Sequence, residues 1–143
     1  GQLWPYLNEL KIYWCPMDRT NTALFRARDM QVASYIMNGA ASDYSVGVNG
    51  VRGRTYKLSN FASDAVLFWE TDEERPSFWD NAASYPHEGV TKRHNIGAVV
   101  GNAGAHVEYM KFDERYRLAG FSGSSGGVRP GRLWCSPGSP TGD

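Results

Sequence analysis

The stretch "RHNIGAVVGNAGAHVEYMK", residues 93–111, decides the fold. Val99 and Val107 belong to two short runs of β-branched and aromatic residues, which are typical of strands. Between the runs lies "GNAG", residues 101–104, whose glycines and asparagine tolerate the positive φ angles of a tight turn. The pattern predicts an antiparallel hairpin over residues 96–112 that turns within 101–104, with Val99 and Val107 on buried strands.

The histidines of the chain raise the question of a metal or catalytic site. The candidate ligands are His87, Glu88, His94 and His106, with Glu70 and Asp72 earlier in the chain. Zinc takes such ligands, but their spacing forms neither HExxH nor HxH. In the expected hairpin His94 lies beyond His106 and not opposite it. We therefore expect hairpin-edge histidines and no metal or catalytic site, with a metal-dependent hydrolase using His87, His94 and His106 as an alternative.

Short patterns in the rest of the chain predict further strands and little helix. Strands are expected at residues 11–14, 32–37, 55–58, 65–72 and 132–135, an Asn-Gly hairpin within 38–53, and short helices at 5–10 and 113–119, the last capped by Asp113. The connection 73–89 is expected to be irregular, with Phe78 and Trp79 inward. Long helices and βαβ alternation are missing, so one α+β domain over residues 1–143 is expected, built on an antiparallel sheet of short hairpins.

Composition narrows the classes of function. Fifteen basic and fifteen acidic residues give a net charge of zero, which gives no electrostatic reason for binding nucleic acid. No run approaches the ~20 apolar residues of a membrane span. Five Trp and eight Tyr are many for this length. Aromatic residues mostly build cores, but a carbohydrate- or ligand-binding module stays open as an alternative function.

The two cysteines lie near opposite ends of the chain, at Cys15 and Cys135. This placement suits a disulfide that ties the ends together, which a loop-entropy model values at about 4–5 kcal/mol. Such a bond would place the protein in an oxidising compartment. The alternative is two buried, unpaired thiols.

The hairpin segment also resembles a family of bacterial prepilin-like proteins. Members carry a His, nine residues, then Asp-Gly, usually followed by His-Val. Arg93-His94, Gly97, Val99 and His106-Val107-Glu108 align with that signature, and residues 6–16, 33–38 and 132–143 resemble other family elements in the same order. Gly104-Ala105 stands where the family has Asp-Gly, so the turn here is expected to depend on the backbone freedom of glycine.

The resemblance implies the head domain of a type II secretion-like pseudopilin. It implies a structural, non-catalytic subunit without cofactor, facing the periplasm, with other pseudopilins or secretion-machine subunits as partners. A helix absent from this sequence would anchor it in the inner membrane, so Gly1 is expected to be a cut end. Residues 1–10 are expected to lie beside the sheet at the edge of the domain, with some apolar surface near them. Within the family motif His94, Gly104, His106 and Val107 are assigned structural roles, and the loops 73–89 and 120–131 are expected to contact partners.

Overall fold

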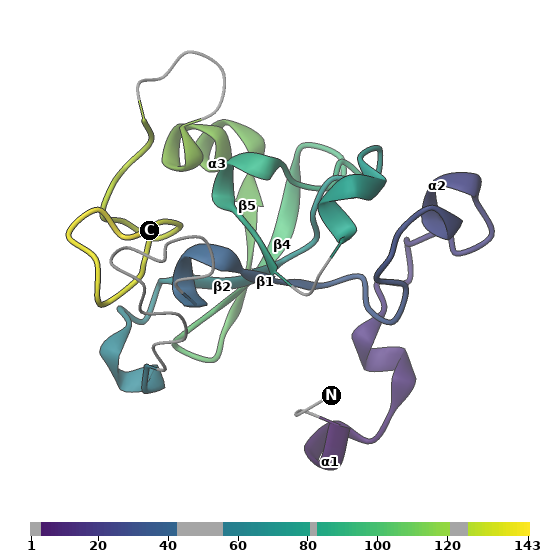
Figure 1. The fold of residues 1–143 in the computed structure, drawn as a ribbon, viewed down its shortest axis with the longest axis horizontal. Coiled ribbons are helices and arrows are strands. Elements are labelled where there is room, and N and C mark those ends of the chain that lie inside the picture. Colours follow the sequence, from purple (N-terminus) through teal and green to yellow (C-terminus); the bar gives the residue numbers. More distant parts are fainter. Residues whose placement is uncertain (1–3, 43–55, 81–82, 121–125) are drawn as a thin grey trace.

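A five-stranded sheet forms the centre of the computed structural model, which describes residues 4–42, 56–80, 83–120 and 126–143 (Figure 1). The strands are β1 (Ile36–Asn38), β2 (Val66–Trp69), β3 (Ala83–Ser84), β4 (Gly97–Asn102) and β5 (Val107–Lys111). Their order is β3-β1-β2-β4-β5. Three neighbouring pairs are antiparallel, whereas β1 and β3 are parallel. After β2 the chain passes to the other side of β1, and β3 runs opposite to β2 and therefore in the direction of β1. The α+β class is confirmed, and the expected all-antiparallel sheet is corrected to a mixed one.

Helices are short in the described residues. The α-helices are α1 (Trp4–Leu7), α2 (Ala23–Arg26) and α3 (Phe112–Ala119), and the 3-10 turns are η1 (Leu10–Tyr13), η2 (Gly39–Ser42), η4 (Leu58–Asn60), η5 (Pro76–Trp79) and η6 (Pro86–Glu88). The N-cap of α3 is Lys111 and not Asp113, and Gly120 ends the helix with a φ of 86°. The predicted strand at 11–14 is wrong, since η1 lies there. The predicted strand at 132–135 is wrong too, because residues 132–134 form bends and Cys135 has no regular structure.

The hairpin of β4 and β5 confirms the central prediction of an antiparallel pair. Its register joins Gly101 to Val107 and Val99 to Tyr109, so the turn falls at 103–106 and not within 101–104. Val99 is half-buried, but Val107 is 70 % exposed, which corrects the expectation that it is buried. Most of the expected hairpin at 38–53 lies outside the described residues.

The main core lies between the sheet and α3. Its buried members include Ile36, Trp69, Val100, Met110, Leu118, Leu133 and Trp134. Trp79 is fully buried, as expected, and Phe78 is half-buried. Within the described residues, no helix combines the length and the apolar character that crossing a bilayer requires.

Candidate functional site

A buried network of charged side chains joins the part of the chain before β1, called here the N-terminal segment, to the sheet. Arg93 lies between two carboxylates, with Nη1 2.8 Å from Oδ1 of Asp18 and Nη2 3.1 Å from Oε1 of Glu70. Arg28 pairs with the other oxygen of Asp18 at 2.9 Å, and the hydroxyl of Ser34 donates to that oxygen at 2.8 Å. Burial alone would raise the pKa of Asp18, but the hydrogen bonds from Arg28 and Ser34 and the charge of Arg93 outweigh it and lower that pKa.

A thiol, an imidazole and a carboxylate converge beside this network. Nε2 of His94 lies 3.5 Å from Sγ of Cys15 and 2.5 Å from Oε2 of Glu70. One donor atom from each of the three residues lies within 4.8 Å of the other two. Cys15 is 4 % exposed and Glu70 is fully buried, whereas the side chain of His94 is 20 % exposed. The group is therefore closed on the protein side and open to solvent along the imidazole.

Three separate segments place these side chains. Cys15 follows η1, and its sulfur accepts a hydrogen bond from the backbone N–H of Met17 at 3.4 Å. Glu70 directly follows β2, and its backbone oxygen accepts from the N–H of Thr91 at 2.9 Å. The hydroxyl of Tyr109 on β5 donates to the backbone oxygen of His94. These hydrogen bonds hold Cys15, Glu70 and His94 in position.

The geometry at His94 does not suit a nucleophilic triad. In a triad one ring nitrogen accepts the nucleophile's proton while the other donates to the orienting acid. Here both the thiol and the carboxylate meet the same nitrogen, Nε2. Burial, opposed by the Met17 N–H and reinforced by the charge of Glu70, raises the pKa of the Cys15 thiol, which also disfavours a reactive thiolate.

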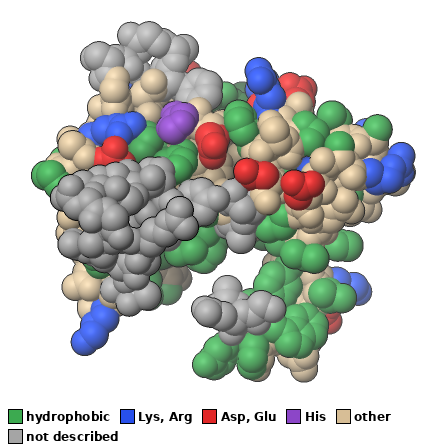
Figure 2. Space-filling model, in the orientation of Figure 1, with side chains coloured by type: hydrophobic (Ala, Val, Ile, Leu, Met, Phe, Trp, Pro, Cys, Tyr) green, Lys and Arg blue, Asp and Glu red, His purple; other side chains and the backbone are tan. Residues whose placement is uncertain are grey.

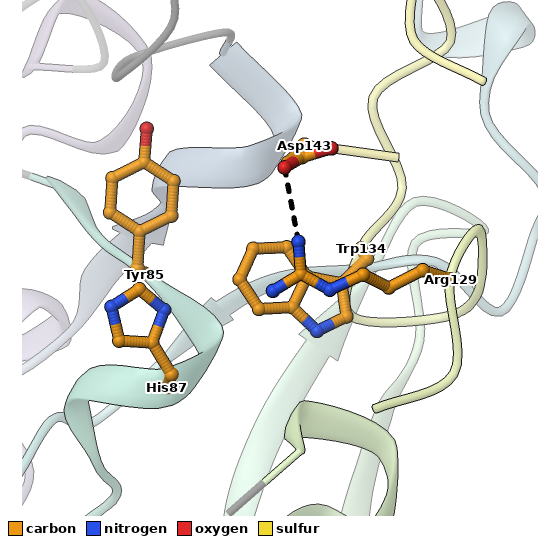
Figure 3. A pocket seen from close by; sticks show the side chains of 5 residues that line it. All are labelled: Tyr85, His87, Arg129, Trp134 and Asp143. Carbon is orange, nitrogen blue, oxygen red and sulfur yellow. Dashed lines mark hydrogen bonds and ion pairs between the residues drawn. The ribbon is translucent and has the colours of Figure 1, made fainter. Parts of the chain in front are cut away.

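His87 lies in a different environment, an open pocket of about 320 Å³ (Figure 3). Its ring lies near the rings of Tyr85 and Trp134, with centroids 5.6 and 5.8 Å away, and those two rings are 6.3 Å from each other. The guanidinium of Arg129 covers the Trp134 ring at 3.3 Å and pairs with Asp143 at 3.0 Å. Since Trp134 is 1 % exposed, its ring offers no open platform for a sugar.

His106 lies in the hairpin turn, where Nε2 is 2.9 Å from Nδ2 of Asn102. The three histidines thus occupy three environments, and the alternative of a hydrolase using all of them has no common site. Among the described residues the ligand-type group is Cys15, Glu70 and His94.

Both cysteines are free thiols, so the predicted disulfide between Cys15 and Cys135 is not formed. Cys135 packs against the small second core cluster and lies 3.9 Å from the backbone oxygen of Val66. Burial raises its pKa to about 12. Cys15 is held instead beside His94, so the two sulfurs belong to different parts of the structure.

Sequence reasoning recognised Glu70 and His94 as candidate ligands but assigned Cys15 to a disulfide. The sequence feature that could have pointed to Cys15 is the proline that follows it in "YWCP", because proline favours tight turns. Here the N–H of Asp18 donates to the backbone oxygen of Cys15 at 2.9 Å, which closes such a turn. No local pattern indicates that this turn meets residues 70 and 94.

An apolar row crosses the face of the sheet that α3 leaves uncovered. Met37 lies opposite Phe68, Phe68 opposite Gly101, and Gly101 opposite Val107, so the row spans β1, β2, β4 and β5. Met37, Phe68 and Val107 are 37, 38 and 70 % exposed. The neighbouring row Ile36–Trp69–Val100 faces the core, as the alternation of strands requires.

A second apolar surface lies on the N-terminal segment. Eight of the 16 exposed large apolar side chains among the described residues lie in residues 4–24. This segment carries α1 away from the sheet, and hydrophobic side chains gather on it (Figure 2). The expectation that residues 1–10 lie beside the sheet is therefore corrected for residues 4–10, while apolar surface near them is present.

Comparisons with protein-family models, curated proteins and solved structures returned no match.

Proposed function

We propose that this chain is the head domain of a pilin-like subunit, with a structural role in a secretion or pilus-like filament of the cell envelope. The observation that carries the proposal is the apolar row Met37–Phe68–Gly101–Val107. A strand face of this kind is normally covered by another element. In the proposed subunit a helix preceding Gly1 covers it.

The shape of the row suits a helix. Gly101 leaves space at its centre, where a Cβ would meet only Cβ of Phe68 at 3.6 Å and its ring at 3.8 Å. Tyr109, 47 % exposed, lies one row further along β5 and widens the strip. An amphipathic helix with an apolar stripe could bury these side chains together.

The N-terminal segment gives the proposal its second support. Tyr6, Leu10 and Ile12 are 84, 62 and 48 % exposed. Scattered apolar residues are ordinary on protein surfaces, but such a concentration marks a contact surface. In the proposed filament it meets the neighbouring subunit, with the head facing the periplasm and the preceding helix in the inner membrane.

The proposed helix can be tested in two steps. The gene sequence upstream of Gln2 is expected to encode a leader and about 20 apolar residues. A cleavable secretory signal without a retained helix would refute the proposal and favour the ligand-binding module.

The second step uses a synthetic peptide covering the half of that helix next to Gln2. It should bind the 143-residue chain, and Phe68→Ser should abolish binding. Leu58→Ser is the matched control, because Leu58 is 57 % exposed but lies on η4 outside the row. Equal binding by both variants would place the helix elsewhere.

A further inference from the structure

We propose that Cys15, Glu70 and His94 form a binding site for Zn²⁺. The proposal does not depend on the function proposed above. It rests on three donor atoms of different chemistry that three distant segments bring within 4.8 Å of one another.

The separations approach those of a tetrahedral zinc site. Zinc bonds of about 2.3 Å to sulfur and 2.0–2.1 Å to nitrogen or oxygen imply ligand separations of about 3.5 Å for S–N and 3.3 Å for N–O. The distance from Sγ of Cys15 to Nε2 of His94 is 3.5 Å and already fits. Nε2 and Oε2 of Glu70, now 2.5 Å apart, would separate by about 0.8 Å as the ion replaces the hydrogen bond between them.

The convergence on one nitrogen supports a cation in the place of a proton. Nε2 of His94 cannot donate to Glu70 and accept from the thiol of Cys15 at the same time. A metal ion satisfies all three atoms at once. Binding releases the thiol proton to solvent and requires the remaining ring proton of His94 on Nδ1.

The surroundings already orient the ligands. Arg93 holds Oε1 of Glu70 at 3.1 Å, which leaves Oε2 for the site. The N–H of Met17 donates to Sγ of Cys15, a contact that favours the thiolate. Such partners around the ligands are a regular feature of metal sites.

The charge of the buried network also suits a divalent ion. Three carboxylates, those of Asp18, Glu70 and Glu73, face two guanidinium groups, those of Arg28 and Arg93. The sum is one negative charge, and the thiolate of Cys15 brings it to two. A divalent cation neutralises this excess.

The donor set selects among metals. A thiolate with imidazole and carboxylate suits zinc, whereas calcium and magnesium prefer oxygen ligands alone. Three protein ligands leave the fourth position to water, on the side where the side chain of His94 is 20 % exposed. The bound ion would fasten the N-terminal segment to Glu70, which directly follows β2.

Calorimetric titration of the reduced, metal-free chain with Zn²⁺ tests the site. We expect one ion per chain with micromolar or tighter affinity. Cys15→Ser, Glu70→Gln and His94→Gln should each weaken binding about tenfold or more. Cys135→Ser, His87→Gln and His106→Gln are matched controls from other environments and should bind as the parent does.

Absence of binding by the parent chain would overturn the proposal. So would binding that survives Cys15→Ser and His94→Gln, or that is lost in the controls. A second measurement needs no variant, and so it covers a failure of the variants to fold. Zinc should slow the alkylation of Cys15, located by peptide mass spectrometry, and an unchanged rate would equally overturn the site.

Discussion

Nη1 of Arg93 lies 2.8 Å from Oδ1 of Asp18, and both side chains are nearly buried, at 9 and 2 % exposure. This pair connects the N-terminal segment with the loop that precedes β4. Asp18 also pairs with Arg28 at 2.9 Å, so two buried cations share this carboxylate, and Arg93 pairs with Glu70 as well. The attachment of the N-terminal segment therefore depends strongly on Asp18.

Replacing Asp18 by Asn should strongly destabilise the fold. The substitution leaves Arg28 and Arg93 buried without the shared negative charge, and breaking a buried pair costs about 3–5 kcal/mol. Urea unfolding should show a loss at or above the lower end of that range. The matched control is Asp29→Asn at an exposed position, where a change below about 0.5 kcal/mol is expected.

The lowered pKa of Asp18 predicts that the folded chain loses stability in acid. The pKa of Asp18 is lower in the folded chain than in the unfolded one, so the unfolded chain takes up its proton first as pH falls. The stabilisation is complete above the unfolded pKa of about 3.9 and disappears as pH falls through the lower folded value. Urea unfolding measured from pH 6 to pH 2 should show a smaller acid loss in Asp18→Asn. An identical pH dependence in both chains would contradict the assignment.

Replacing Arg115 of α3 should also lower the free energy of unfolding. It is 1 % exposed, donates to the backbone oxygens of Pro86 and Gly89 at 2.8 and 3.4 Å, and lies 4.8 Å from the Trp69 ring centroid. Arg115→Met keeps much of the volume but leaves two carbonyl oxygens without a donor, at a cost of about 2–3 kcal/mol. The exposed Arg117 on the same helix provides the control, and Arg117→Met should unfold within about 0.5 kcal/mol of the parent.

The two thiols should react slowly and at different rates. Burial raises the pKa of Cys135 to about 12, and the pKa of Cys15 is also raised. Since the thiolate is the reactive form, iodoacetamide at pH 8 should modify both thiols more slowly in the folded chain than in urea, with Cys135 the slower. Intact mass without reductant should show two free thiols. Rapid labelling of folded Cys135, or a mass lower by two hydrogens, would contradict these environments.

Local patterns sufficed to predict the hairpin and the α+β class. The alternation of β4 and β5 and the glycine-rich turn lie within one short stretch, so the sequence there carries its own evidence. The turn lies at 103–106 and not within the expected 101–104, because Gly101 and Gly104 both permit a turn. The expected strand at 11–14 failed because Ile12 and Trp14 have the composition of a strand but are about half-exposed, and η1 forms there instead.

The group formed by Cys15, Glu70 and His94 was beyond such reasoning. Cys15 and His94 are 79 residues apart, and Glu70 is 24 residues from His94. Their meeting depends on the order of the strands and on the ion pairs of Arg93, which no local pattern encodes. The sequence alone indicates Glu70 and His94 as candidate ligands, but it pairs Cys15 with Cys135, and both of these thiols are free.

Two substitutions in the hairpin turn should change the free energy of unfolding in opposite directions. Ala105 has a φ of 60°, in the left-handed region where an L-residue pays about 1–2 kcal/mol. Ala105→Gly relieves that strain but adds freedom to the unfolded chain, so a net gain of about 0.5–1 kcal/mol is expected. Gly104 is constrained differently, because a Cβ there would lie 2.7 Å from the backbone oxygen of Ser63.

Gly104→Ala should therefore cost about 1–3 kcal/mol, since the clash is with backbone and the N–H of Gly104 donates to the same oxygen at 2.8 Å. Both positions are exposed, so burial of the added or removed methyl group contributes little to either result. Urea unfolding of the two single variants and the parent measures both effects. If Ala105→Gly instead destabilised the chain while Gly104→Ala were neutral, the left-handed residue of this turn would be Gly104 and the register of the hairpin would have to be redrawn.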